Sequence, residues 1–304
     1  MTKNTSTKKQ QKPPLATIIV INRNNYDLTK QCIQSIFQNT FYTNYEILLI
    51  DNGSEDKSFE KLKAEFPNIK TIRNYKNTGF PYALNQGYRK ADGHYLAPMN
   101  NDAIVLSGWL EEAIKVLDSE KNIAIAGCTE VTFEQAKNII ELEKLKNSPN
   151  AEKMTLPVGW VTKKEMIEKI GFLDTEFFSP IYGEELDWNF RAHNMGYKIM
   201  KASRSLVIHL GSQDTKKVMN DKNRFILMNF HRHRAMLFNL SFVELLRFIP
   251  GLSLIFVSSF FNGMIGYLLK SYWLTLKDLK IILAQRRKKR GFIEFKEPKF
   301  TQIK

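Results

Sequence analysis

The chain of 304 residues is poor in the residue types that mark several structural classes. It holds 2 cysteines, 15 glycines and 10 prolines, which excludes a disulfide-stabilised scaffold and a collagen-like repeat. Cys32 and Cys128 lie far apart and match no metal-binding spacing, so cysteine usage indicates a reducing compartment. Wholesale disorder is also excluded, because 21 phenylalanines, 11 tyrosines and 4 tryptophans need a core in which to be buried.

Acidic residues are scarce at both ends of the chain. Residues 1–14 carry a net charge of +4 and residues 270–304 carry +8, out of +14 for the whole chain. The body between these ends is close to neutral, which argues against nucleic acid as a partner. Residues 1–14 lack the apolar stretch of a secretory signal, and we expect a disordered basic leader there.

Strands and helices alternate through the first half of the chain. Continuous apolar runs predict buried strands at Ala16–Ile21, Tyr45–Ile50 and Tyr95–Met99. Helical spacing separates these runs, so the sequence predicts an α/β fold with a mixed, mostly parallel sheet flanked by helices. Ligands of such sheets bind beyond the carboxyl ends of the strands. That rule points to Asn22–Asn24, to Asp51 and to Asn100–Asp102.

Two of the motifs could bind a cation. Asn100-Asn101-Asp102 places a carboxylate at the end of a predicted strand, where it could bind a divalent cation, although the same sequence is an ordinary turn. His209 ends another apolar run before Gly211, and it is either a metal ligand or a structural histidine.

Two further motifs could carry chemistry or binding. Glu184, Glu185 and Asp187 put three carboxylates within four residues, which suits a general base or a solvated helix N-terminus. Asn77 and Gly79 precede a predicted helix, a junction that suits close approach to a ribose or phosphate.

Taken in order, these motifs resemble the inverting nucleotide-sugar glycosyltransferases of family 2, which have the GT-A fold, and within them the rhamnosyltransferase-like branch. The likeness covers residues 15–212. It runs through VINRNN, IDNGS, NTGF, MNND, GEELDWNFR and IHLGS.

The resemblance implies a role for each matching position. Asp102 and His209 would hold a divalent cation, Mn²⁺ or Mg²⁺. Glu185 would be the catalytic base as the second acid of the pair that Glu184 begins, with Asp187 as the fallback. The residues expected at the acceptor are Trp160, Tyr182 and Trp188. The residues expected at the nucleotide-sugar donor are Asn22, Asn24, Asp51, Asn77, Gly79, Asn85, Asn100, Asn101 and Asp102.

The implied reaction is a single displacement that moves a sugar from a UDP- or dTDP-linked donor to a hydroxyl of a cell-surface glycan or lipid-linked acceptor. Two alternatives stay open. A sugar-1-phosphate nucleotidyltransferase would need a glycine-rich loop after the first strand, and VINRNN has none. A catalytically silent family member would act as a membrane or assembly subunit. Homo-oligomer formation is also left open.

The C-terminal part changes character near residue 222, so we expect a glycosyltransferase domain at 15–221, a helical appendage at 222–290 and a tail at 291–304. Residues 249–269 carry no charge over 21 positions, enough to span a bilayer. Positive charge on both sides argues against a span, and we expect a hairpin or interfacial helices on the anionic cytoplasmic face of the cell membrane.

Two alternatives for this region are a true span and a soluble cap or oligomer contact. Within it, the run His231–Arg234 could be a phosphate clamp or a plain basic helix face.

Overall fold

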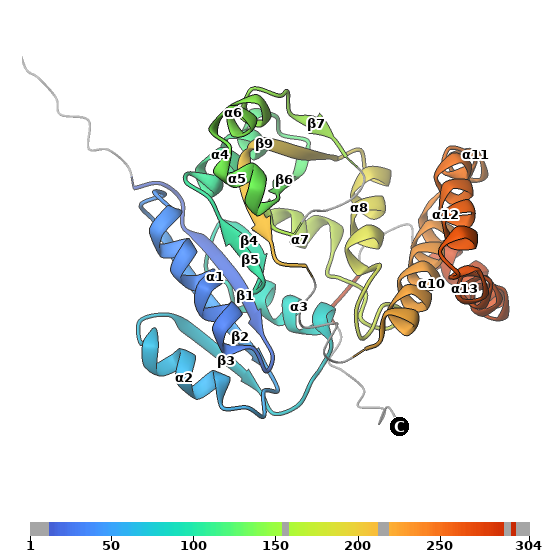
Figure 1. Cartoon of the computed structure of the whole chain (residues 1–304), viewed down its shortest axis with the longest axis horizontal. Helices are drawn as coiled ribbons and strands as arrows, with labels where there is room; N and C mark the ends of the chain where they lie inside the picture. The colour runs from blue at the N-terminus through green and yellow to red at the C-terminus, as the bar shows by residue number, and fades with distance from the viewer. Residues whose placement is uncertain (1–11, 154–157, 212–218, 289–292, 296–304) are drawn as a thin grey trace, which may run out of the picture.

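A nine-stranded mixed sheet forms the centre of the computed structural model, which describes residues 12–153, 158–211, 219–288 and 293–295 (Figure 1). Most of the predicted leader and tail therefore lies outside the described residues. The strands are Ala16–Asn22 (β1), Tyr45–Asn52 (β2), Lys70–Asn74 (β3), Tyr95–Asn100 (β4), Ala103–Val105 (β5), Ile123–Val131 (β6), Ala151–Glu152 (β7), Trp160–Lys163 (β8) and Lys198–His209 (β9).

The strand order is β3-β2-β1-β4-β8-β6-β9-β5, with β7 paired to β9. The longer ladders, β1 with β2 and β4, β2 with β3, and β6 with β9, are parallel, whereas β8, β5 and β7 pair antiparallel. This confirms the predicted mixed, mostly parallel sheet. It also brings the carboxyl ends of β1, β2 and β4 to one edge, where polar residues follow each strand.

Helices cover both faces of the sheet and bury one core on each. Side chains of α1, α2 and α4 pack into one core, and those of α3, α7 and α8 into the other. These helices and the two short ones between β6 and β7 are Tyr26–Asn39 (α1), Ser58–Glu65 (α2), Phe80–Lys90 (α3), Trp109–Ser119 (α4), Phe133–Lys137 (α5), Ile139–Lys146 (α6), Lys164–Ile170 (α7) and Glu184–Asn194 (α8).

Within the described residues, five helices follow β9 and pack at one side of the sheet domain (Figure 1). The first, α10, packs against α8 and also against α13 and α14. Among the described residues, no helix is both long enough and apolar enough to cross a membrane. The uncharged run instead folds into two helices that break at residues 262–264. The five helices are Asp221–Asn239 (α10), Phe242–Leu246 (α11), Ile249–Phe261 (α12), Ile265–Lys277 (α13) and Leu279–Lys288 (α14).

Candidate active site

A cavity of about 400 Å³ opens beyond the carboxyl ends of β1, β2 and β4. Its volume falls in the range of small-molecule sites. Seven predicted site residues line it, namely Asn77, Asn100, Asn101, Asp102, Tyr182, Glu184 and Glu185. Nine lining residues were not among the predicted site residues, namely Ile21, Arg23, Asn52, Phe80, Met99, Pro180, Ile181, Gly183 and Met219.

The predicted pair Asn22 and Asp51 lies behind this lining as a buried polar network. The Asn22 amide donates to the Asp51 carboxylate at 2.8 Å and to the hydroxyl of Ser58 at 2.9 Å. Asp51 also accepts from the backbone N–H of Ser54 at 3.1 Å. Asn24 accepts from the N–H of Glu55 at 2.7 Å. These three predicted donor residues therefore hold the loops after β1 and β2 in place rather than line the cavity.

Asn52 organises the loop that leads into α3. Its amide donates to the side-chain oxygen of Asn77 at 3.1 Å and to the carbonyl of Gly79 at 3.3 Å. Its own side-chain oxygen accepts from the N–H of Thr78 at 3.1 Å. Asn77 in turn accepts from the N–H of Gly79 at 3.0 Å. The predicted segment thus presents Asn77 to the cavity, and Gly79 contributes backbone geometry with a φ of 84°.

Asn85 does not reach the cavity, so its predicted donor contact is corrected. It is buried in the middle of α3 and pairs in both directions with the backbone of Leu173. The amide donates to the Leu173 carbonyl at 2.8 Å, and the side-chain oxygen accepts from the Leu173 N–H at 2.9 Å. Asn85 therefore fastens α3 to the chain that leads to α8.

Asp102 and His209 meet because β5 pairs antiparallel with the end of β9. Oδ2 of Asp102 lies 3.3 Å from Nε2 of His209, and the other ring nitrogen, Nδ1, lies 3.1 Å from Oε1 of Glu130. The hydrogen bond that the His209 ring donates to Asp102 is the main cause that raises the pKa of His209. Asp102 lines the cavity, whereas His209 is not among the lining residues and meets the site through its contact with Asp102.

Glu184 and Glu185 stand at the start of α8, and both line the cavity. Burial raises the pKa of Glu185 to about 8. Burial, and secondarily the charge of Glu185, raises the pKa of Glu184 well above its usual value. A carboxyl group that titrates near neutrality is suited to accept a proton during catalysis.

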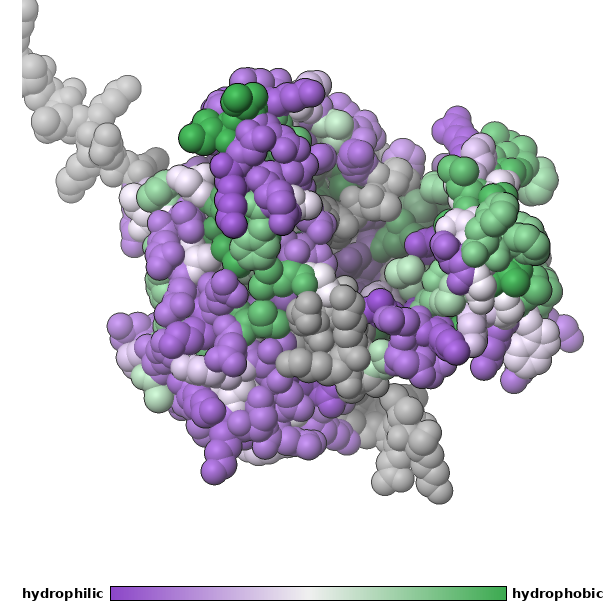
Figure 2. All heavy atoms as spheres, in the orientation of Figure 1, coloured by the Kyte–Doolittle hydropathy of each residue, from purple (hydrophilic) through white to green (hydrophobic). Residues whose placement is uncertain are grey.

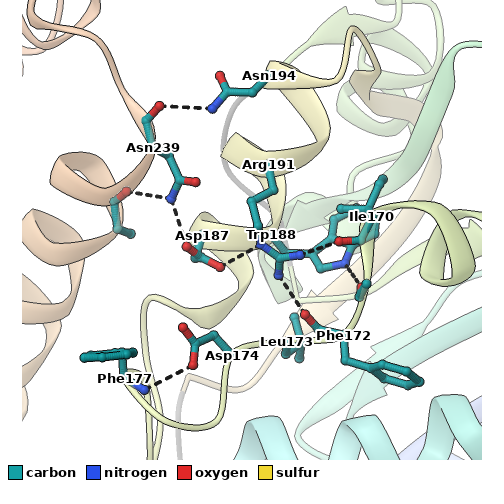
Figure 3. A network of polar contacts seen from close by, with 12 residues as sticks. Ile170, Phe172, Leu173, Asp174, Phe177, Asp187, Trp188, Arg191, Asn194 and Asn239 are labelled. Atoms are coloured by element: carbon teal, nitrogen blue, oxygen red, sulfur yellow. Dashed lines mark hydrogen bonds and ion pairs between the residues drawn. The ribbon is translucent and has the colours of Figure 1, made fainter. Parts of the chain in front are cut away.

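Asp187 is not among the cavity-lining residues and forms a buried ion pair, so its prediction as a fallback base is corrected. Its Oδ2 lies 2.9 Å from Nε of Arg191, one helical turn later, and its Oδ1 accepts from Asn239 of α10 at 2.8 Å (Figure 3). Arg191 also donates to the carbonyls of Ile170 and Phe172, each at 2.7 Å. These bonds join α8 to α7 and α10, which is a structural role.

Trp160 and Trp188 belong to the core, so their prediction as acceptor walls is corrected. Both are 2% exposed and pack in the core on the α3, α7 and α8 face. The Trp188 indole N–H donates to the carbonyl of Gly171 at 2.8 Å. Of the three residues predicted at the acceptor, Tyr182 alone lines the cavity.

The run His231–Arg234 contacts the loop before α8 through hydrogen bonds to its backbone. Nδ1 of His231 lies 2.8 Å from the carbonyl oxygen of Tyr182. Arg234 donates to the Phe177 carbonyl at 2.5 Å and pairs with Asp278. None of the four residues in this run lines the cavity, so the alternative of a phosphate clamp is not supported.

Arg23 lines the cavity and lies in the predicted strand-end range Asn22–Asn24, although it was not among the expected donor residues. It follows the last residue of β1, and its buried Nε has no hydrogen-bond partner within the described residues. A guanidinium in this state is suited to bind an anionic ligand. The signal was present in the sequence, because Arg23 lies inside the strand-end motif VINRNN.

Residues 17–170 match the model of "Glycosyl transferase family 2". The chain belongs to this family. One relative is the glycosyltransferase AglE of Haloferax volcanii, 21% identical over 64% of this chain and 67% of AglE. An uncharacterised glycosyltransferase of Haemophilus influenzae is 33% identical, and the match spans 42% of this chain and 40% of that protein.

A solved structure confirms the fold of this family 2 member. The mannosyltransferase PcManGT of Pyrobaculum calidifontis, in complex with GDP-Man and Mn²⁺, superposes with a TM-score of 0.61 at 16% identity. The likeness covers 87% of this chain and 88% of that one. It confirms the predicted GT-A fold.

Proposed function

We propose that this family 2 glycosyltransferase is an inverting enzyme that moves a sugar from a nucleoside-diphosphate sugar to an acceptor hydroxyl by a single displacement. One observation carries the proposal: Asp102 and Glu185, from opposite halves of the domain, line the same cavity of about 400 Å³. That arrangement supports a leaving-group site and a base that act on the same bound donor.

Glu185 is the proposed catalytic base. The charged carboxylate takes the proton of the acceptor hydroxyl as its oxygen attacks the anomeric carbon. The bond from that carbon to the diphosphate oxygen breaks, and the nucleoside diphosphate leaves with the bonding electrons. Attack from the face opposite the leaving group inverts the configuration at the anomeric carbon, and no covalent enzyme intermediate is required.

Asp102 and His209 are the proposed cation ligands, and their chemistry fits a divalent cation. An oxygen and an imidazole nitrogen lie 3.3 Å apart, and Glu130 holds the far nitrogen of the ring, the usual outer contact of a ligating histidine. Among the described residues no three acidic, histidine or cysteine side chains form a metal cluster, so diphosphate oxygens and water would complete the shell. When bound, Mn²⁺ or Mg²⁺ neutralises charge on the departing diphosphate.

Arg23, Asn52 and Asn77 are proposed to contact the donor. Asn52 and Asn77 present amide groups to the cavity near the N-terminus of α3, which suits a ribose or a base edge. Arg23 lines the same cavity, its Nε has no hydrogen-bond partner in the part of the chain that the structure describes, and it suits a phosphate oxygen. We expect a UDP- or dTDP-linked sugar, and because PcManGT holds GDP-Man, GDP-mannose belongs in the same test.

The acceptor is proposed to be a cell-surface glycan or its lipid-linked precursor, reached at the cytoplasmic face of the membrane, and Tyr182 is its proposed contact. The basic charge of the C-terminal region supports this location. The experiment is a thermal-shift screen of nucleotide sugars with and without Mn²⁺, followed by NMR of the product formed from the best donor.

The expected outcome is a cation-dependent thermal shift by one donor and hydrolysis or transfer that gives the opposite anomer. Retention of configuration would contradict the single displacement. Donor binding without any turnover, even of water, would favour the catalytically silent alternative. Formation of a nucleotide sugar from a sugar 1-phosphate and a nucleoside triphosphate would favour the nucleotidyltransferase alternative.

A further inference from the structure

The C-terminal helices carry a large apolar surface that no described element covers. We define this apolar surface by Phe242 of α11, Leu254, Phe260 and Phe261 of α12, and Leu269 and Trp273 of α13. Each of these side chains is more than half exposed, with Phe261 at 79%. Figure 2 shows the apolar colour gathered over α11, α12 and α13, on the side away from the sheet domain. Single exposed apolar residues are ordinary, but a continuous patch of this kind marks an interaction site.

The helices that bear this surface are held firmly from the inner side. Leu268, Ser271 and Thr275 of α13 are buried, and α13 packs against α10. Tyr272 stacks on His233 at a ring-centroid distance of 4.7 Å. The inner face of α13 is therefore packed against α10. The outer face is apolar, although no packing within the described fold depends on those side chains.

The composition of α12 is unusual for a helix at a protein surface. It carries no charged residue, its apolar side chains are not confined to one face, and Ser259 is its one buried residue. Helices of that kind are buried in a core or in lipid. At 13 residues α12 is too short to span a bilayer, so a position in the plane of the interface fits its length.

Charge at the edge of the apolar surface is positive. Arg247, Lys270, Lys277 and Lys280 are exposed there. The two acids of this region are engaged: Glu244 accepts from the backbone N–H of Ser241 at 2.6 Å, and Asp278 pairs with Arg234. Exposed cations beside apolar and aromatic side chains complement an anionic lipid surface. Trp273, which lies under the ammonium of Lys277 at 5.6 Å, suits the headgroup level.

We propose that the apolar surface inserts into one leaflet of an anionic bilayer, with the basic residues around it against the lipid phosphates. A second copy of the chain is the other candidate occupant. A two-fold contact would bring each patch against its twin and set Lys270 and Lys277 near their own copies, where like charges repel. The charge pattern therefore favours lipid.

Docking in this way would fix the position of the cavity relative to the membrane. α10 packs against α13 on one side and against α8 on the other, and α8 begins with Glu184 and Glu185. The inference rests on the proposed function in one respect: an acceptor linked to lipid would be met at this surface. Binding to the bilayer itself does not depend on catalysis.

The test is flotation of the full chain with vesicles, without donor or acceptor. One set of vesicles is pure phosphatidylcholine, and the other contains roughly one-third phosphatidylglycerol. A triple variant, Leu254→Ser with Phe260→Ser and Phe261→Ser, removes exposed apolar side chains that the fold does not need. A double variant, Lys270→Glu with Lys280→Glu, reverses two exposed charges. The matched control, Phe41→Ser with Ile140→Ser, removes apolar side chains of similar exposure (63% and 83%) far from the C-terminal helices.

We expect the natural chain and the control to float with anionic vesicles, and the triple variant to stay in solution. Each lysine removed should weaken binding about fivefold or more, and high salt should act in the same direction. Equal binding to neutral vesicles would overturn the anionic preference. Failure to float, together with a dimer in light scattering that the triple variant abolishes, would overturn the proposal in favour of a second copy. Donor hydrolysis, assayed separately in solution, reports on the proposed function and should survive in the triple variant.

Discussion

His231 of α10 and Tyr182 of the loop before α8 are joined by a hydrogen bond of 2.8 Å. Burial lowers the pKa of His231 to about 4, so the ring is neutral near pH 7, and Nδ1 must carry the hydrogen because its partner is a carbonyl. Tyr182 and Gly183 have φ angles of 76° and 84°, and a Cβ at Gly183 would lie 2.8 Å from that of His231. The C-terminal helices therefore support the turn that presents Glu185.

Removal of the hydrogen bond from His231 to Tyr182 should slow catalysis without weakening donor binding. His231→Ala is expected to lower kcat about 10- to 100-fold, because a base displaced by about 1 Å loses its alignment, while the donor Kd stays nearly constant. His231→Asn, whose amide can replace the Nδ1 donor, should recover most of the rate. Steady-state kinetics with donor titration gives both quantities.

The control for this prediction is His233→Ala on the same helix. His233 is also buried, but it stacks on Tyr272 rather than contacting the loop. We expect it to reduce stability and leave kcat of the folded enzyme unchanged. Similar losses of kcat in both variants would show that His231 has no specific positioning role.

The activity should depend on pH through Glu185. Because burial raises its pKa to about 8, kcat/KM is expected to increase as pH rises through 8, where the carboxylate becomes charged. Glu185→Gln should abolish this rising limb. A profile that is flat between pH 6 and about 9 would contradict the assignment.

Stability should change in the opposite sense. From its usual value near 4.5 to about 8, the folded protein retains a proton on Glu185 that the unfolded chain has lost. The folded state therefore binds more protons in this window, and the free energy of unfolding should fall as pH rises across it. Denaturant titration at several pH values, with Glu185→Gln for comparison, measures the contribution of this residue.

Asp187 should be a stability residue. Asp187→Ala leaves the buried guanidinium of Arg191 without its carboxylate, and we expect the free energy of unfolding to drop by about 3–5 kcal/mol. The exposed pair of Glu165 and Lys169 has the same i,i+4 spacing, so Glu165→Ala is a matched control with an expected cost below about 1 kcal/mol. Equal costs in urea titrations would refute the distinction.

Asn77 and Asn85 should separate donor binding from stability. Asn85→Ala removes two buried hydrogen bonds to Leu173 and should cost about 1–3 kcal/mol of stability with an unchanged donor Kd. Asn77→Ala should raise the donor Kd about tenfold, since this side chain lines the cavity. Calorimetric titration of both variants checks the contrast, and a normal donor Kd for Asn77→Ala would remove it from the site.

Asp102 should make donor binding depend on the cation. In the natural protein a chelator is expected to raise the donor Kd at least about tenfold, since a cation held by Asp102 and His209 would offset the negative charge of the diphosphate. In Asp102→Ala the chelator should have little further effect on the donor Kd. In Glu130→Gln the effect of the chelator should be intermediate between those in the natural protein and in Asp102→Ala, because Glu130 contacts the ring nitrogen of His209 that faces away from Asp102. The same donor Kd with and without chelator in the natural protein would contradict the proposed cation site.

The buried strands of the sheet were predictable because each is marked by a run of apolar residues in its own sequence. β1 and β2 are almost continuously apolar, and polar residues mark where they end. β5 was missed because it has three residues and exists through its ladder with β9. Residues 132–155 are polar and rich in lysine and glutamate, a composition that fits either a helix or a loop. They include the helices α5 and α6, which begin with side-chain caps at Thr132 and Asn138.

The site was predictable where the strand-end rule applies, as at Asn100–Asp102. The choice between Glu185 and Asp187 was not, because both stand in the first turn of α8. The structural role of Asp187 depends on its ion pair with Arg191, one turn later, and on its hydrogen bond from Asn239, which is 52 residues away in sequence. His231 was equally hidden, since its partner is a backbone carbonyl that carries no sequence signal.

The most direct test of the account is the turnover of Glu185→Gln with a saturating donor, beside Glu184→Gln as its neighbour in the same turn. Glu185→Gln is expected to lose about 10²- to 10⁴-fold in kcat with an unchanged donor Kd, and Glu184→Gln is expected to lose much less. Near-normal turnover of Glu185→Gln would contradict the assignment of the base and, with it, the proposed displacement in the cavity shared with Asp102.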